Sequence, residues 1–416
     1  MKSLISKLRS NSHFKAITYW SIVVLLFLYT FSIPSFSGRG GWYIVSYFLM
    51  ALFAVFTIIH TFLYSKFKIN KWLILPASFV IFTLIGTSIY SHDFRMWLTL
   101  VLMLITLLVF YYSFDAIDNY RFLCKILLFA FLAFGIYYII IYRDPIFHFR
   151  ISDSRLGAYF DNVNAIGFYF TIAFTLSLFI GLFYKRKLEL LYLIPALIFL
   201  FLGFFTGSRA FLIGVLSSVV VVIFFKLRKR LLLFATVIGL LIGLCFILVN
   251  IPQLNFLKDQ FERTVFTIFG IGQSKIDTST VQRIIWPKYA YYLGSKNMLF
   301  GYGCNGFKIY SGVGTYAHNN FAELICDFGL IGFVLFTACY LIPVLLSFDK
   351  KGSGLILVPI LFAIYFFRNF FGVTYYSKEA YLVIGLLFYL TKDCKLPKLF
   401  VKRKKTIVKS FCEVSI

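Results

Sequence analysis

The chain has 416 residues, of which 61% are hydrophobic, 21% are aromatic and only 14% are charged. A soluble core of this length could not bury so much apolar surface, so the composition excludes a soluble globular protein and indicates a polytopic membrane protein. The formal net charge of +25 suggests nucleic acid as a partner, but the distribution of the basic residues argues against it.

Apolar runs long enough to cross a bilayer recur along the whole chain. One crossing as a helix needs about 17–25 such residues. We therefore predict an all-α membrane protein that forms a single integral membrane domain over residues 1–416. About twelve transmembrane helices are expected, near Ile17–Ile33, Trp42–Tyr64, Leu73–Tyr90, Met96–Phe114, Phe122–Tyr142, Ala165–Tyr184, Leu188–Phe205, Ala210–Phe225, Leu231–Val249, Phe321–Phe348, Leu355–Phe371 and Glu379–Leu390.

Most of the Lys and Arg residues lie in the amino terminus, in alternate connections between these runs and in a basic tail over residues 391–416. Loops rich in Lys and Arg stay in the cytoplasm, so we expect both termini inside and no nucleic-acid partner. Lys2, Lys7 and Arg9 precede the first run as in a secretory signal, but no small-residue cleavage site follows it. We interpret this run as a retained anchor.

The cysteine pattern indicates neither disulfides nor a metal site. Only Cys304 of the seven cysteines falls in a predicted outer loop, and the chain has no CxxC, HExxH or DxD spacing. We therefore predict no disulfide framework, no metal and no cofactor.

The first polar outer segment, Arg143–Asn164, carries three arginines among acidic residues. For Arg143 and Arg150, local ion pairs in a solvated loop explain the sequence as well as function does. Arg155 lies in RLGAYFDNVNAIG, framed by glycine and asparagine, and there we favour a contact with substrate.

The next signal is the short turn TGSR, Thr206–Arg209, between two predicted helices. Arg209 is thus expected at the outer end of a membrane helix. Guanidinium groups bind phosphate oxygens through paired hydrogen bonds. The alternative is an arginine that extends to the membrane interface without a functional role.

The longest segment outside the membrane covers residues 250–320 and separates the ninth and tenth predicted helices. Loops of this length in compact proteins are usually functional. Its stretch STVQRIIWPKYAYYLGSKNMLF predicts a helix on the membrane surface, with Thr280 as its cap and Pro287 as a bend or start. We expect Arg283 to face the same cavity as Arg209, and Trp286 to offer a flat ring for a sugar.

Gly301–Gly306 matches G-x-G-x-x-G, the dinucleotide fingerprint. That fingerprint requires a preceding strand within a βαβ unit, whereas a predicted helix precedes this one on the outside. We reject nucleotide binding and expect Gly303 to provide a tight turn beneath a substrate.

His318 is the candidate for proton chemistry on the outer side, because an imidazole titrates near neutral pH. A lone histidine is more often structural, so both interpretations stay open on chemistry alone. Glu323 and Asp327 follow it one helical turn apart, on the same face of the next helix. Ionisable groups in membrane helices usually face the protein interior, and we predict Arg368 as the counter-ion of Glu323 or Asp327.

These motifs together resemble the superfamily of bacterial O-antigen polymerases and O-antigen ligases. The resemblance is sharpest from Arg283 to Phe336, in the pattern R…W…FGYG…AHNNFAELICDFGLIGFVLF, preceded by RLGAYFDNVNAIG and TGSR. Its most specific part is the His318–Asn319 step, followed by Glu323 and then by Gly329.

The resemblance implies an inverting, metal-independent membrane glycosyltransferase of the GT-C kind, multi-pass in the bacterial cytoplasmic membrane, with its active site on the outer side. Its donor would be undecaprenyl-pyrophosphate-linked glycan. By motif position, the catalytic residues would be His318, which orients or deprotonates the acceptor hydroxyl, and the pyrophosphate-binding Arg209 and Arg283. The candidate substrate-binding residues are Arg155, Asn319, Glu323, Trp286 and Gly303.

The intact FGYG step and the following Phe307 favour a polymerase of O-antigen, capsular polysaccharide or exopolysaccharide. A ligase that transfers the glycan to lipid A core or another acceptor is the alternative, and a polysaccharide transporter or flippase is a second. A structural membrane protein is a third possibility. Besides the lipid bilayer, a chain-length regulator and a flippase are candidate partners.

Overall fold

A computed structural model describes residues 6, 8–36, 43–65, 70–147, 156–157, 159–160, 162–184, 187–227, 230, 232–233, 236, 239, 262, 278–349 and 352–395 of the chain. Helices make up nearly all of these residues and none of them forms a strand. The predicted all-α class is confirmed for this part of the chain.

Nine helical segments in the described ranges are long and apolar enough to cross a membrane. They confirm the first eight predicted runs and the tenth. They are α2 (Ser12–Ser35), α3 (Tyr43–Tyr64), η1, α4 and η2 together (Lys71–Ser91), α5 (Phe94–Ile117), α6 (Tyr120–Ile141), α8 (Val163–Phe183), η3 and α9 together (Lys187–Phe205), α10 (Arg209–Leu227) and α15 (Asn320–Ser347).

The other three predicted crossings differ in their outcome. Leu355–Phe371 and Glu379–Leu390 correspond to the shorter helices α16 (Ser353–Arg368) and α17 (Lys378–Leu390). Leu231–Val249 lies almost wholly outside the described residues. The count of twelve therefore stays a prediction.

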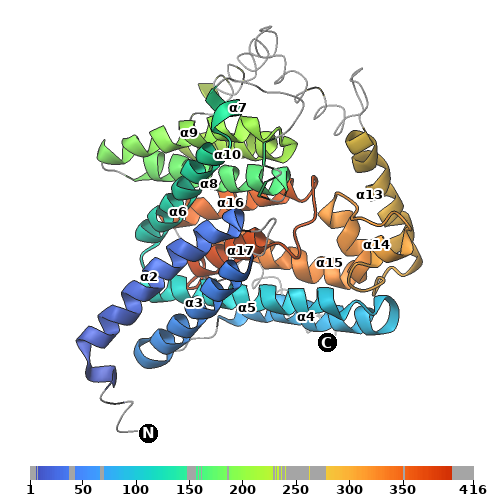
Figure 1. Ribbon diagram of the computed structural model, residues 1–416, viewed down its shortest axis with the longest axis horizontal. Helices are drawn as coiled ribbons and strands as arrows, with labels where there is room; N and C mark the ends of the chain where they lie inside the picture. The colour runs from blue at the N-terminus through green and yellow to red at the C-terminus, as the bar shows by residue number, and fades with distance from the viewer. Residues whose placement is uncertain are drawn as a thin grey trace, which may run out of the picture.

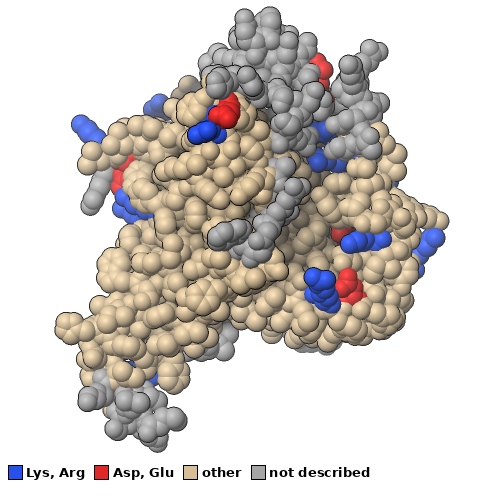
Figure 2. Space-filling model, in the orientation of Figure 1, with Lys and Arg blue, Asp and Glu red and all other residues tan. Residues whose placement is uncertain are grey.

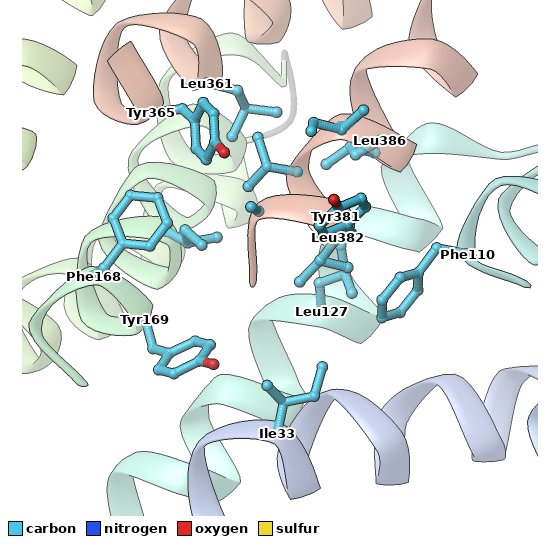
Figure 3. Packing of buried hydrophobic residues seen from close by; sticks show 14 of the residues in the cluster. Ile33, Phe110, Leu127, Phe168, Tyr169, Leu361, Tyr365, Tyr381, Leu382 and Leu386 are labelled. Atoms are coloured by element: carbon cyan, nitrogen blue, oxygen red, sulfur yellow. The ribbon is translucent and has the colours of Figure 1, made fainter. Parts of the chain in front are cut away.

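Helix α17 lies inside the bundle. All its residues from Glu379 to Tyr389 are buried, as expected of a helix that is apolar on every side. Figure 3 shows the residues around it. Tyr381, Leu382 and Leu386 of α17 pack in a cluster with Ile33 of α2, Phe110 of α5, Leu127 of α6, Phe168 and Tyr169 of α8, and Leu361 and Tyr365 of α16.

Three further helices lie outside the predicted crossings: α7 (Arg143–Phe147), α13 (Thr278–Lys296) and α14 (Gly306–Tyr310). Figure 1 shows α13 and α14 together at one end of the bundle, beside α15. Figure 2 shows that charged side chains are sparse on the visible face and that uncharged residues cover most of it. Such a surface suits contact with lipid.

Helix α15 is interrupted at Gly329, which has φ 62° and ψ −168°. The interruption leaves backbone groups without partners in their own helix, and the preceding loop supplies them. The N–H groups of Tyr302 and Gly303 donate to the carbonyls of Cys326 and Asp327, at 2.9 and 2.6 Å. In return, the N–H of Leu330 donates to the carbonyl of Met298 at 2.7 Å and that of Ile331 to Leu299 at 3.4 Å.

Glycines make this close approach possible. A Cβ atom on Gly301 would overlap the backbone of Asp327, and one on Gly329 would overlap the backbone of Leu299. Both glycines also have positive φ angles, which side chains disfavour. The FGYG step is therefore an integral part of the packing around α15.

Candidate functional site

Arg209 is the first residue of α10 and follows the turn Thr206–Ser208. Its side chain is only 1% exposed, and its Nη2 donates a hydrogen bond to Oγ1 of Thr280 at 2.7 Å. An arginine extended toward the membrane interface would keep its head group in water. Burial against α13 is therefore evidence against that alternative.

The buried face of α13 brings Arg283 into the same region. Thr280, Arg283, Pro287 and Ala290 are buried at the three- and four-residue spacing of one helix face, and the helix packs against α15. Thr280 lies inside α13 and holds Arg209, so its predicted capping role is wrong. Pro287 likewise lies within the helix. Arg209 and Arg283 are thus linked through one turn of α13.

His318 lies in the loop before α15, between two aromatic rings. Its ring stacks on that of Trp286, with centroids 5.3 Å apart and an interplanar angle of 13°. Tyr316 packs edge-on against its ring at 4.3 Å. Among the described residues, Nδ1 of His318 has no hydrogen-bond partner. The imidazole is thus held firmly, and its Nδ1 is a buried polar atom without a partner among these residues.

The electrostatic surroundings keep His318 neutral. Burial first, and then the positive charges of Arg283 and Arg368, lower its pKa to about 4. Each factor disfavours the imidazolium form. At physiological pH the ring therefore offers a lone pair to a donor such as a sugar hydroxyl.

Glu323 fixes the loop that carries His318. Its Oε2 accepts a hydrogen bond of 2.6 Å from the N–H of Ala317, and its side chain is 1% exposed. On the other side, Oδ1 of Asn319 accepts from the N–H of Ala322 at 3.0 Å and caps α15. Both neighbours of His318 are thus bound to the start of α15, which holds its backbone at a φ of 58°.

The predicted ion pair of Arg368 with Glu323 or Asp327 is wrong. Asp327 accepts hydrogen bonds from the N–H of Phe307 at 2.7 Å and from the hydroxyl of Tyr375 at 2.8 Å. The two carboxylates are therefore satisfied by α14 and by the loops that carry Ala317 and Tyr375. Arg368 instead lies with its guanidinium carbon 5.8 Å from the ring centroid of Phe168 on α8.

Gly303 lies against the segment η2 (Thr87–Ser91). A Cβ atom there would come within 2.6 Å of Cα of Thr87, and the N–H of Cys304 donates to Oγ1 of Thr87 at 3.1 Å. Packing alone explains a glycine at this position. Contact of Gly303 with substrate stays a prediction.

A cavity of about 490 Å³ lies among α10, α13 and the end of α16. Arg283, Asn319 and Ser217 contribute its polar groups, and its other walls are the apolar residues Ile213, Leu216, Pro287, Phe367, Phe370 and Phe371. An apolar chain in this cavity would lie beside the guanidinium of Arg283. The cavity thus suits a lipid that carries a phosphate group.

Residues 194–337 match the family model described as O-antigen ligase. This segment of the chain is similar to the O-antigen ligase family. This match confirms the resemblance drawn from the sequence motifs, and the matched segment contains Arg209, Arg283 and His318. No curated protein matches the chain.

Three other arginines of the sequence analysis have different outcomes. Arg155 and Arg150 lie outside the described residues, so their roles stay predictions. Arg143 is exposed and lies 3.3 Å from the carboxylate of Asp144, which agrees with the local ion pair considered for it.

Sequence reasoning missed Tyr316 and the position of Arg368 near His318. Tyr316 is two residues before His318, so an aromatic residue close to the candidate base was an available signal. No local pattern relates Arg368 to His318, because α16 and the loop meet only in the folded protein.

Proposed function

We propose that the protein is a membrane glycosyltransferase that polymerises undecaprenyl-pyrophosphate-linked oligosaccharide repeat units into O-antigen, capsular polysaccharide or exopolysaccharide. The reaction takes place at the outer face of the bacterial cytoplasmic membrane. One observation carries the proposal. Within the O-antigen ligase segment, α13 holds Arg283 and Trp286 against His318.

The donor lipid occupies the apolar cavity, with its pyrophosphate against Arg283. As the bond between the anomeric carbon and the phosphate oxygen breaks, negative charge grows on that oxygen. Guanidinium groups fixed in a buried site stabilise such charge without reorganisation. Arg209 adds a second positive charge near the leaving group, because its hydrogen bond to Thr280 holds it against the same face of α13.

His318 acts on the acceptor. Its neutral ring accepts a hydrogen bond from the acceptor hydroxyl, whose oxygen attacks the anomeric carbon from the side opposite the leaving group and inverts its configuration. With a pKa of about 4, the free imidazole is a weak base. The charge of the bound pyrophosphate opposes the effect of Arg283 and raises the pKa of the ring in the donor complex, so the ring takes the proton as the new bond forms.

An O-antigen ligase is the second candidate, because the matching family model is described by that name. The two reactions share donor and chemistry and differ in acceptor. In the ligase, the attacking hydroxyl belongs to lipid A core or another glycan acceptor.

Purified protein in lipid nanodiscs should be mixed with lipid-linked repeat units, with and without lipid A core. The polymerase produces a ladder of lipid-linked glycans of increasing length without any other acceptor. The ligase produces a single product, and only with lipid A core. Absence of glycan transfer in both mixtures, while the protein stays folded, would contradict both the polymerase and a ligase that uses lipid A core.

A further inference from the structure

A second cavity, of about 280 Å³, is lined by residues that include Tyr316 and Arg368 but not Arg283. The ends of α2, α3, α8, α16 and α17 surround it, and many of its side chains are polar. Tyr316, which packs against His318, lines this cavity, and Phe371 lines both cavities. The imidazole is therefore close to two compartments of different character, one apolar and one polar.

Arg368 gives the polar cavity an unsatisfied cation. The residue is only 5% exposed, and neither its Nε nor its Nη1 has a hydrogen-bond partner within the described ranges. Buried guanidinium groups are nearly always paired, because an unpaired one is costly. Gly372 lines the same cavity, and a Cβ atom on it would overlap Nη1 of Arg368. The chain thus leaves room for this guanidinium beside the cavity.

Lys378 adds a second cation. Its Nζ lies 3.4 Å from Oγ of Ser46 and 4.6 Å from the ring centroid of Tyr47, and no ion pair to a described carboxylate forms. The neighbouring carboxylate of Glu379 also lines the cavity and accepts a hydrogen bond from the hydroxyl of Tyr169 at 3.0 Å. With two basic side chains and one acidic side chain in its lining, the cavity has a net charge of one positive unit.

We propose that this polar cavity binds the acceptor glycan through an acidic, carboxylate-bearing sugar that pairs with Arg368 and Lys378. The inference rests on the proposed function, since it names the acceptor of that reaction. One carboxylate neutralises the net charge of the cavity, whereas a pyrophosphate would overcompensate it. A planar carboxylate also fits the paired N–H groups of a guanidinium.

The position next to Tyr316 supports the acceptor role. An acidic sugar held by Arg368 places a neighbouring hydroxyl near Nδ1 of His318, while the donor approaches from the side of Arg283. Aromatic rings of Tyr43, Tyr47 and Tyr376 also line the cavity and offer surfaces for sugar rings. The two substrates thus reach the imidazole from separate cavities.

Binding should be measured on nanodisc-embedded protein without donor, using a glucuronate-terminated trisaccharide and its carboxyl-reduced counterpart. The wild-type protein should bind the acidic form at least tenfold more tightly. Arg368→Gln should abolish this preference, and Gly372→Ala should weaken it by displacing the guanidinium while keeping its charge. Arg143→Gln, which removes an exposed arginine, should leave it unchanged.

Equal affinity of the wild-type protein for both trisaccharides, or a preference that survives in folded Arg368→Gln protein, overturns the inference. A second result would also overturn it: inorganic pyrophosphate competes with the acidic trisaccharide, and this competition is lost in Arg368→Gln but not in Arg283→Gln protein. The cavity would then be a phosphate site.

A transfer assay with both trisaccharides as acceptors separates the two proposals. Equal extension of both contradicts the acidic acceptor site and leaves the proposed function intact. Selective binding without any transfer from lipid-linked donor contradicts the proposed function and, with it, the acceptor role of the cavity.

Discussion

The imidazole of His318 lies near two guanidinium groups, Arg283 on α13 and Arg368 at the end of α16. Its own loop contributes the rings and backbone contacts that hold it, whereas its charge state depends on residues from other elements. A substitution of Arg283 or Arg368 can therefore change the pKa of His318 without altering the contacts that hold its ring.

The pH dependence of chain extension should reflect the low pKa of His318. Because the pKa is lowered to about 4, the neutral form persists well below the usual value of about 6.5, and kcat/KM should fall only as the pH approaches about 4. Arg368→Gln removes one cation that disfavours the imidazolium. The pKa then rises, and the acidic limb of the kcat/KM profile should move to higher pH.

The control is Arg143→Gln, whose profile should coincide with that of the wild-type protein. An acidic limb near pH 6.5 in the wild-type protein, or a limb that Arg368→Gln leaves in place, would contradict the electrostatic environment described for His318.

The hydrogen bond between Arg209 and Thr280 should matter for catalysis. Thr280→Val keeps the volume and removes the acceptor of this bond, and hydrogen bonds to charged groups contribute about 1.5–3 kcal/mol. Chain extension should therefore fall by about tenfold or more. Thr280→Ser restores the hydroxyl and should recover most of the rate. Equal rates for the Val and Ser variants would show that this contact does not position Arg209.

Motifs of the sequence identified His318, Arg283 and Arg209 as candidates. In the structure, Arg283 lies on α13, Arg209 of α10 donates to Thr280 of α13, and Trp286 of α13 stacks on His318. The sequence did not reveal that Arg368 forms no ion pair with Glu323 or Asp327. Its expected carboxylates are satisfied by the N–H groups of Ala317 and Phe307, and only the folded loops bring those groups there.

Among the elements, α15 and the loop before it act as one unit. The interruption at Gly329 leaves two carbonyls and two N–H groups unpaired in the helix, and the segment from Met298 to Gly303 pairs with all four. This exchange fixes the end of the loop that follows α13. It therefore helps to hold α13 and its arginine against the start of α15.

Gly329→Ala should destabilise the protein severely. A Cβ atom there meets the backbone of Leu299, which cannot move easily, and φ is positive. A loss of about 4 kcal/mol or more is expected from strain and overlap together. Gly314 also has a positive φ, but nothing lies within 4 Å of its added Cβ, so Gly314→Ala should cost only about 1–2 kcal/mol.

Thermal unfolding in detergent compares the two glycine variants directly. A similar decrease in midpoint temperature for both would indicate that backbone strain alone, and not the close approach of the loop, requires Gly329.

Of the twelve runs predicted from the sequence, nine correspond to helices of the described residues that are long and apolar enough to cross a membrane, since length and hydropathy determine them. They did not reveal the interruption of α15, because its sequence is apolar on both sides of Gly329. The burial of α17 on all sides became evident only in three dimensions.

On the scale of the molecule, the two cavities draw on helices that are distant in sequence. Their linings come from α2, α3, α8, α10, α13, α16 and α17 and the connections at one end of the bundle. The predicted orientation puts this end outside the cell, and that orientation stays a prediction.

Cysteine labelling of intact cells tests the orientation. Lys308 and Lys187 are both exposed lysines, on α14 and on η3, and the first is expected outside and the second inside. A membrane-impermeant maleimide should label Lys308→Cys in intact cells, and Lys187→Cys only after permeabilisation. The reverse pattern would place the site on the cytoplasmic side. The wild-type protein serves as the control, because any labelling of it comes from its native cysteines.

The most direct measurement of the central claim is chain extension of lipid-linked repeat units by His318→Asn and Arg283→Gln proteins. Asparagine tolerates the left-handed backbone of His318. His92, an exposed histidine with a similar φ of 53°, provides the matched control His92→Asn. We predict that His318→Asn and Arg283→Gln each abolish the ladder of products at normal protein level, while His92→Asn retains it. A full-length ladder from both site variants would contradict the claim that these two residues form one glycosyltransferase site.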